Sequence, residues 1–405
     1  MKAPLQAPHG MTGNRENVLS RRIAAVDVLR GLIMIIMALD HTRDFFSALD
    51  VSPTDPLHSW PTLFFTRWIT HLCAPGFVAL AGTSVYLQRQ RGRTKEQTAS
   101  RLLTRGVWLI FLELAVVSPG IFFTYHFHFL QVIYAIGGSM IILAGLQFLP
   151  TRWVAIYGLL VVFLHNMTDK FDLAHAHGAW AWKLLLIAPG VFMNHGQFWA
   201  LVLYPIVPWS GVMALGYAFG AVVSLPPEKR RSRSVQLALA ALAVFAELRF
   251  THAYGDPILF ERLGTWKQTM MSFLNVTKYP PSLEYVCVML GVLLLLFALF
   301  DWMLQRKMAQ KALDVVEVYG RVPFFYYVVH FYSLHILALI TLMVVSHTVH
   351  VHPPMPIFNP PPPGAGFSLP VVYAIWLALV AALYLPCRWF AGVKARRKDW
   401  WLSYL

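Results

Sequence analysis

Ten apolar runs, each about long enough to cross a membrane as a helix, restrict the fold of this 405-residue chain more than any other feature. A spanning helix needs about 20 predominantly apolar residues. Only 13% of the residues are charged, whereas an ordinary soluble domain carries roughly 25%. The predicted spans are 24–46, 62–87, 105–124, 129–149, 152–167, 198–224, 235–252, 282–304, 320–346 and 369–392. The sequence therefore predicts an all-α integral membrane protein, a polytopic bundle of about ten transmembrane helices.

The basic residues gather in segments that all lie on one side of the membrane if the N-terminus is cytoplasmic. These segments are "RQRGRTK", "PEKRRSR", "QRKMAQK" and "VKARRKDWW". Because cytoplasmic loops carry an excess of Lys and Arg, we predict cytoplasmic tails at 1–22 and 393–405 and a transmembrane domain at 23–392, in the inner (cytoplasmic) membrane. The net charge of +14 then reflects topology and contact with anionic lipid. Membrane lipid is therefore an expected partner, and nucleic acid is not.

The first predicted span is unusual because it carries several ionisable residues. At 100° per residue, His41 lies about 20° from Arg30 on the helix wheel, and Asp27 and Asp44 lie within about 60° of Arg30. Asp40 falls at the edge of this sector. Charged residues inside a membrane are costly and normally face the interior of the bundle or a wet cavity. The alternative is a structural Asp27–Arg30 pair, with His41 near the outer headgroups.

The two ends of this face suit different chemistry. Arg30 and His41 are separated by about 16 Å along a helix. An arginine in the cytoplasmic half can bind a phosphate or a carbonyl as a permanent donor. A histidine flanked by carboxylates, here Asp40 and Asp44, can be held in one tautomer and act as a general base at neutral pH.

Other spans supply further candidates. In "TRWITHLCAP", Arg67 and His71 are i, i+4 neighbours, and Pro75 removes the helix hydrogen bond to the carbonyl of His71. We place His71 in the catalytic site and Arg67 among the substrate-binding residues, together with Lys278 of "KYPPSL". A histidine satisfied at its own kink, or a simple helix cap around Lys278, is the alternative.

Two arginines at the inner ends of other spans, Arg105 and Arg321, are placed where phosphates can reach them. Ordinary snorkelling of arginine to the interface explains them equally well. The His-rich outer segments "HFH", "HAH" and "HTVHVH" contain no cysteine and have irregular spacing. We therefore predict no metal site, since zinc sites normally combine regularly spaced ligands.

Several stretches carry a resemblance to a known family. "RIAAVDVLRGLIMIIMALDHTRDFF" resembles the opening helix of transmembrane acyltransferases. The stretches "FFTRWITHLCAPGFVALAGTS", "YPIVPWSGVMALGYAFG", "TKYPPSLEYVCVMLG" and "YGRVPFFYYVVHFYSLH" are similar to bacterial relatives of heparan-α-glucosaminide N-acetyltransferase. The resemblance implies a bundle of ten or eleven helices that takes acetyl-CoA from the cytoplasm and passes the acyl group to an acceptor at the outer side. Arg30 would then lie toward the CoA and His41 near the point of transfer.

One departure from the family concerns the catalytic base. In the lysosomal member, the catalytic histidine lies in the loop after the first span, in a "His-Ala-Ser-Trp" context. This chain has "LHSWP" there, so His58 competes with His41 for the role.

The leading hypothesis is an acyl-CoA-dependent transmembrane acyltransferase. Its donor is acetyl-CoA, and its acceptor is an amine or hydroxyl of a sugar or glycan. Direct transfer and an acyl-histidine intermediate are both open. A transporter that uses the Asp, His and Arg face as a proton-coupled pathway is the alternative function, and a membrane sensor or scaffold is a third. A homodimer is an open alternative to a monomer.

Overall fold

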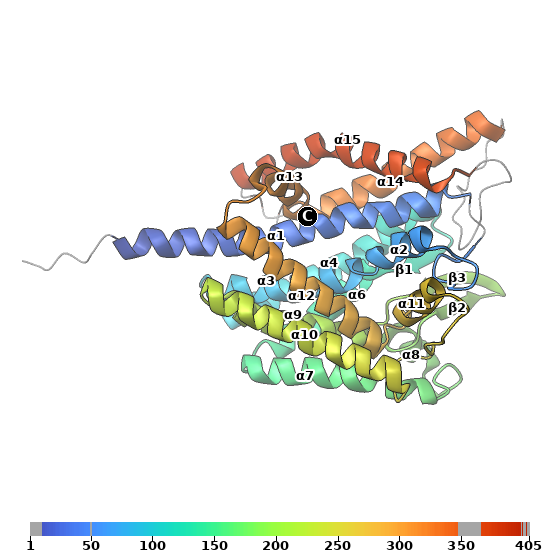
Figure 1. Cartoon of the computed structure of the whole chain (residues 1–405), viewed down its shortest axis with the longest axis horizontal. Helices are drawn as coiled ribbons and strands as arrows, with labels where there is room; N and C mark the ends of the chain where they lie inside the picture. Colours follow the sequence, from blue (N-terminus) through green and yellow to red (C-terminus); the bar gives the residue numbers. More distant parts are fainter. Residues whose placement is uncertain (1–9, 49–50, 347–365, 398, 400–401, 403–405) are drawn as a thin grey trace, which may run out of the picture.

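Figure 1 shows the computed structural model, which describes residues 10–48, 51–346, 366–397, 399 and 402. The histidines of "HTVHVH" lie outside the described residues. The first half contains α1 (Gly10–Phe46), α2 (Pro61–Thr70), α3 (Cys73–Gln90), α4 (Lys95–Leu112), the π-helical turn η1 (Glu113–Val117), α5 (Ser118–Phe122), α6 (Val132–Leu146), α7 (Thr151–Leu164), the 3-10 turn η2 (His165–Lys170) and α8 (Ala179–Leu185). The second half contains α9 (Ile206–Val223), α10 (Pro227–Thr251), α11 (Trp266–Leu274), α12 (Leu283–Gln305), α13 (Gln310–Arg321), α14 (Pro323–Ser346) and α15 (Leu369–Arg396).

Seven helices in the described part of the chain are long and apolar enough to cross a membrane. They are Pro61–Gln90, Lys95–Phe122, Ile206–Val223, Pro227–Thr251, Leu283–Gln305, Pro323–Val345 and Leu369–Arg396. Each overlaps a predicted span, but the count of ten is not confirmed. The other three predicted spans fall on α1, whose apolar stretch is interrupted by charged residues, and on α6 and α7, which have 15 and 14 residues.

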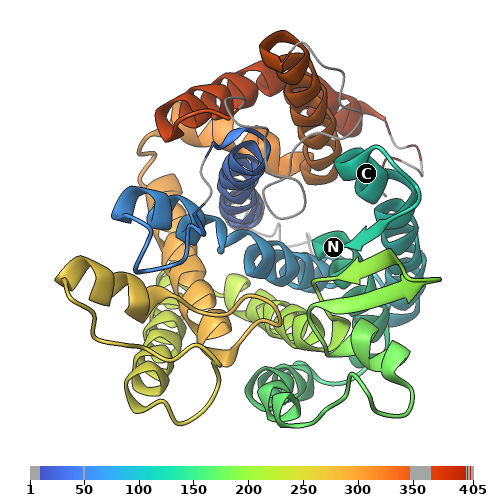
Figure 2. The same ribbon diagram turned by 90° about the vertical axis from the view of Figure 1, so that its right-hand side faces the viewer.

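The central helix of the bundle is α1. It packs against α2, α3, α12, α13, α14 and α15, and seen end-on it lies between α14 and α15 on one side and α3 and α9 on the other (Figure 2). Apolar residues on several of its faces, such as Ala25, Val28 and Ile33, are almost completely buried. From Asp27 onward, the ionisable residues of α1 are also buried or half-buried inside the bundle, as predicted for costly charges in a span.

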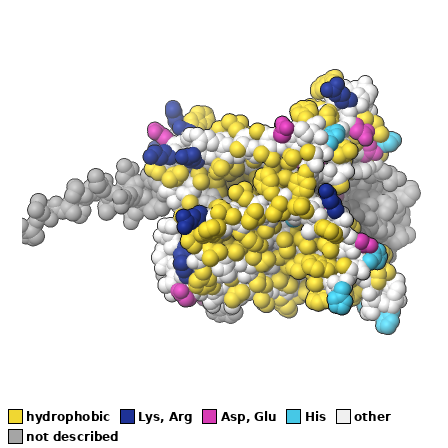
Figure 3. Space-filling model, turned by 90° about the horizontal axis from the view of Figure 1, so that it is seen from below, with side chains coloured by type: hydrophobic (Ala, Val, Ile, Leu, Met, Phe, Trp, Pro, Cys, Tyr) yellow, Lys and Arg dark blue, Asp and Glu magenta, His cyan; other side chains and the backbone are white. Residues whose placement is uncertain are grey.

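The two ends of the molecule differ in charge. On the face shown in Figure 3, a broad hydrophobic belt separates the end at which α1 begins, where more of the Lys and Arg side chains lie, from the opposite end, which carries the visible histidines. This distribution is the one that the positive-inside rule predicts for a protein that crosses a membrane along its long axis.

A small sheet corrects the all-α prediction. It contains β1 (His128–Leu130), β2 (Gly190–Asn194) and β3 (Gln197–Val202) in the order β1-β3-β2, with β1 parallel and β2 antiparallel to β3. The sheet lies at the end of the bundle opposite the start of α1 (Figure 1). The segments of β1 and β3 are apolar, so hydropathy alone places them inside helices. Their pairing partners are distant in the chain, which a local pattern does not reveal.

The break between α2 and α3 confirms the prediction made from Pro75. The helix is interrupted at His71 and Leu72, and the backbone carbonyl of His71 instead accepts a hydrogen bond from the hydroxyl of Tyr285 at 2.9 Å. A carbonyl released by proline inside a membrane needs such a partner. The break thereby fixes α2 and α3 against α12.

The amphipathic helix α13, which the sequence did not predict, crosses α1 at a very close contact. A Cβ on Gly320 would lie 1.9 Å from the backbone oxygen of Asp27, and one on Gly31 would lie 1.9 Å from that of Val316. Only glycine permits this separation, as at other small-residue helix contacts in membranes. The contact also brings the carbonyl of Gly320 within 3.1 Å of the guanidinium of Arg30.

We expect Gly320→Ala to destabilise the protein by about 1–3 kcal/mol, because the added methyl meets rigid backbone. The matched control is Gly145→Ala in α6, where an added Cβ meets nothing within 4 Å; this change should be neutral or slightly stabilising. Thermal and denaturant unfolding in detergent measure the stability of both variants relative to wild type. Equal midpoints for the two variants would contradict the proposed importance of the α1–α13 contact.

Candidate functional site

A basic pocket of about 260 Å³ opens beside α1, between α3, α4, α6, α14 and α15. We define it by its six cationic lining residues, Arg30, Arg93, Arg101, Arg105, Arg321 and Lys394. No described residue that lines it is acidic. Three residues predicted from the sequence to bind the donor, Arg30, Arg105 and Arg321, thus line the same pocket.

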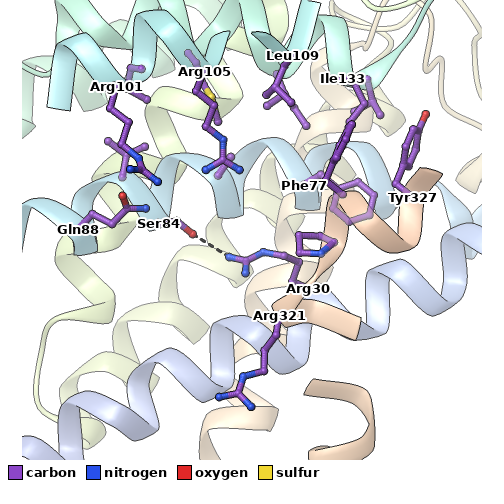
Figure 4. Close-up of a pocket in the computed structure, with 18 of the residues that line it drawn as sticks. Arg30, Phe77, Ser84, Gln88, Arg101, Arg105, Leu109, Ile133, Arg321 and Tyr327 are labelled. Carbon is purple, nitrogen blue, oxygen red and sulfur yellow. Dashed lines mark hydrogen bonds between the residues drawn. The ribbon is translucent and has the colours of Figure 1, made fainter. Parts of the chain in front are cut away.

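The arginines of this pocket differ in how they are held. Arg30 donates to Asp27 at 2.7 Å and to the hydroxyl of Ser84 at 2.9 Å, so the predicted Asp27–Arg30 pair exists and also positions a pocket residue. Arg105 and Arg101 extend from α4 across the pocket (Figure 4). The guanidinium of Arg321 points away from theirs (Figure 4) and lies 3.6 Å from Glu317. The pocket can hold a polyanion such as a nucleotide phosphate.

Farther along α1 is a smaller space of about 70 Å³, which we name the histidine cavity. Its polar lining includes Asp40, His41, Asp44, Arg67 and Lys278. The structure therefore brings together five of the residues that the sequence nominated for catalysis or substrate binding.

A third space, the loop cavity of about 350 Å³, lies between the end of α1, the start of α2 and the segment 275–279. It shares Asp44, Arg67, Lys278 and Tyr279 with the histidine cavity. On the other side, the histidine cavity shares Phe77, Val132 and Tyr327 with the basic pocket. The three spaces thus form a series along α1, with the histidine cavity in the middle.

The partner of His41 is another histidine. His41 Nδ1 lies 2.7 Å from His330 Nε2, and His330 Nδ1 lies 2.9 Å from the backbone oxygen of Tyr326. A carbonyl oxygen only accepts, so in the neutral pair His330 carries its proton on Nδ1 and accepts from His41 through Nε2. His41 is then protonated on Nδ1, which leaves its Nε2 lone pair available as a base.

The predicted role of Asp40 and Asp44 as the groups that orient His41 is wrong. Asp40 forms ion pairs with Arg67 and, at 3.0 Å, with Arg43, whereas Asp44 pairs with Arg43 at 2.6 Å. The two carboxylates and the two guanidiniums, all buried or half-buried, thus neutralise one another, as charges in a low dielectric require. The histidine tautomer is fixed from α14 instead.

Lys278 lies in the wall between the histidine cavity and the loop cavity, with only 8% of its surface exposed. Its Nζ lies 5.1 Å from the ring centre of Tyr279 and 5.9 Å from that of Tyr204. Among the described residues, no carboxylate forms an ion pair with it. This aromatic cage holds a cation beside the space that contains His41.

The other two candidate bases lie elsewhere. His71 is buried and lines the loop cavity, and its Nδ1 has no hydrogen-bond partner among the described residues. His58 is 72% exposed and lines none of the three spaces; its Nδ1 lies 2.7 Å from Asp55. The hydrogen bond from His58 lowers the pKa of the Asp55 carboxyl. Neither histidine lines the same space as His41.

Two residues of α14 were not among the predicted site residues. His330 contacts His41 from 289 positions away in the chain, and Tyr327 lines both the basic pocket and the histidine cavity. The available signal was the polar residues among aromatics in "RVPFFYYVVHFY". Within the described residues, no group of three or more His, Cys, Asp or Glu is arranged to hold a metal ion.

Comparison with known proteins agrees with the resemblance carried by the motifs. Residues 22–249 match the family described as heparan-alpha-glucosaminide N-acetyltransferase, catalytic. The matched region contains Arg30, His41 and Arg105 but ends before Lys278 and the α14 residues. A search of curated proteins found no significant match. Because the match covers more than half of the chain, this protein belongs to the heparan-alpha-glucosaminide N-acetyltransferase catalytic family.

Proposed function

We propose that the protein transfers an acetyl group from cytosolic acetyl-CoA to an amine or hydroxyl of a sugar or glycan on the other side of the membrane. One observation carries this proposal: the basic pocket, the histidine cavity and the loop cavity form a series along α1, with His41 in the middle space. The family supplies the reaction class, acetyl transfer within a membrane. The acetyl-CoA donor and the sugar acceptor are our inference.

The excess of Lys and Arg at the end where α1 begins supports a cytoplasmic location for that end, in the inner membrane. The basic pocket would then face the compartment that contains acetyl-CoA. The loop cavity would face the acceptor.

The donor fits the chemistry of the basic pocket. Acetyl-CoA carries several phosphate charges, and the pocket offers six cations without an acidic residue in its described lining. Arg30, Arg101 and Arg105 would hold the phosphates. At the end of the basic pocket away from Arg101, Phe77 and Tyr327 separate it from the histidine cavity. The thioester of a bound acetyl-CoA would reach this wall between the two spaces.

In the proposed reaction, His41 Nε2 removes the proton from the acceptor hydroxyl or amine. The acceptor oxygen or nitrogen forms a bond to the thioester carbonyl carbon, the carbon–sulfur bond breaks, and its electron pair leaves on the CoA sulfur. His41 returns the proton to that thiolate. His41 Nδ1–H donates a hydrogen bond to His330 Nε2 throughout, which keeps the base oriented. Because the middle space borders both outer ones, donor and acceptor can be bound at the same time, which is what direct transfer requires.

We expect His41→Ala to reduce acetyl transfer by roughly 100-fold or more, since it removes the general base. His58→Ala, on the exposed loop, should retain most of the activity. In the assay, the purified protein is incubated with radiolabelled acetyl-CoA and a panel of amino sugars and glycans. Free thiol and labelled product are measured in the same reaction. An inactive His58→Ala beside an active His41→Ala would show that the wrong base has been chosen. A wild-type protein that carries acceptor across vesicles without forming product would instead support the transporter.

The pairing of the two histidines gives a second prediction. We expect His330→Leu to lower kcat by about tenfold or more, because His41 loses the acceptor that fixes its tautomer. His330→Gln should be more active than His330→Leu, because the Gln amide oxygen can accept the hydrogen bond from His41 Nδ1–H. The pH dependence of kcat should change in the Leu variant and be closer to wild type in the Gln variant. Two variants with equal activity and unchanged pH profiles would contradict this role.

The basic pocket gives a third prediction. We expect Arg105→Gln to weaken CoA binding by roughly tenfold or more, because a charge-assisted hydrogen bond is lost. The control is Arg233→Gln on α10, where the side chain is exposed, contacts Gln236 and lines none of the three spaces. Titration calorimetry with CoA at two salt concentrations measures the difference. Equal affinities for the two variants would remove Arg105 from the donor site.

A further inference from the structure

We propose that the hydroxyl of Tyr327 donates a hydrogen bond to the carbonyl oxygen of the acyl thioester as negative charge develops there during transfer. The inference rests on the proposed function and adds a catalytic residue to it. Two observations carry it. Tyr327 lies between the basic pocket and the histidine cavity, and its buried hydroxyl has no hydrogen-bond partner among the described residues.

Tyr327 lies at the junction of the two spaces that the reaction must connect. It lines the basic pocket and the histidine cavity, together with Phe77 and Val132. Figure 4 shows it at the end of the basic pocket away from Arg101, on the side of Phe77. The other two residues of this wall are hydrocarbon. The phenol is therefore the only polar side chain among the residues that line both spaces in the described structure.

The hydroxyl of Tyr327 has no hydrogen-bond partner among the described residues, although the residue is only 2% exposed. A buried phenol normally finds a partner, and an unpaired one costs free energy. The hydroxyl of Tyr326 is also buried without a partner, but Tyr326 lines none of these spaces. The missing partner matters at Tyr327 because a ligand that joins the two spaces can supply an acceptor there.

The ring of Tyr327 is held against the base. It packs edge-on to His41 with ring centres 6.4 Å apart, and its centre lies 5.7 Å from that of His330 and 5.2 Å from that of Phe331. A donor fixed in advance costs little reorganisation when charge appears on the substrate. His41 would act on the acceptor while Tyr327 acts on the acyl carbonyl, and no proton leaves Tyr327.

The test is Tyr327→Phe, which keeps the ring and removes only the hydroxyl. We expect kcat to fall by roughly 100-fold, with the affinity for CoA and the unfolding midpoint unchanged. The matched control is Tyr332→Phe on the same helix, whose hydroxyl donates to the backbone oxygen of Val116 at 2.9 Å and which lines none of the three spaces. This control should keep wild-type kcat.

The outcomes separate this inference from the proposed function. A wild-type enzyme that transfers acetyl, with a Tyr327→Phe variant of equal kcat, would overturn the role of Tyr327 alone. Weaker CoA binding with unchanged kcat would also overturn it, because the hydroxyl would then act in ground-state binding. A wild type without acetyl transfer to any acceptor would overturn the proposed function, and the role of Tyr327 with it.

Discussion

The rest of the site depends on how α1 satisfies its own charges inside the bundle. Asp40 and Asp44 are neutralised by Arg67 from α2 and Arg43 from α1. Removing one member would leave an unpaired buried charge, which costs far more than the pair contributes. The network therefore fixes the position of α2 beside α1. It also occupies both carboxylates, so that His41, one residue from Asp40, must find its partner on another helix.

That partner gives the site a particular electrostatic character. In a His–Asp pair, a carboxylate stabilises the imidazolium that forms when the base takes a proton. Here the neighbour of His41 is neutral His330, which is anchored by the backbone oxygen of Tyr326. The second imidazole orients His41 without a fixed negative charge. In the proposed reaction, the positive charge that forms when His41 Nε2 takes a proton can be shared with His330 through the hydrogen bond of His41 Nδ1. A neutral histidine pair therefore adds no further permanent charge to the ion pairs and the lysine that already line the middle space.

Helical periodicity predicted what is local to one element. It placed Arg30 and His41 on one face of α1, and Pro75 predicted the break at His71. The partner of His41 could not be predicted, because 289 residues separate it from His330 and the approach depends on how α14 packs. The same limit explains why Asp40 was assigned to His41 rather than to Arg67, and why β3 was assigned to a helix. A hydropathy pattern predicts which residues are buried, but it does not predict which distant residues they contact.

The sizes of the three spaces bear on the choice between an enzyme and a transporter. The outer two have volumes of about 260 and 350 Å³, but the histidine cavity between them has about 70 Å³. By the same measure, that volume holds on the order of five waters. An acetyl group is small enough for such a space, whereas a nucleotide or a sugar chain is not. In the proposed reaction, only the acyl group passes the wall of Phe77, Val132 and Tyr327, so group transfer can proceed while the two substrates stay on their own sides of the membrane.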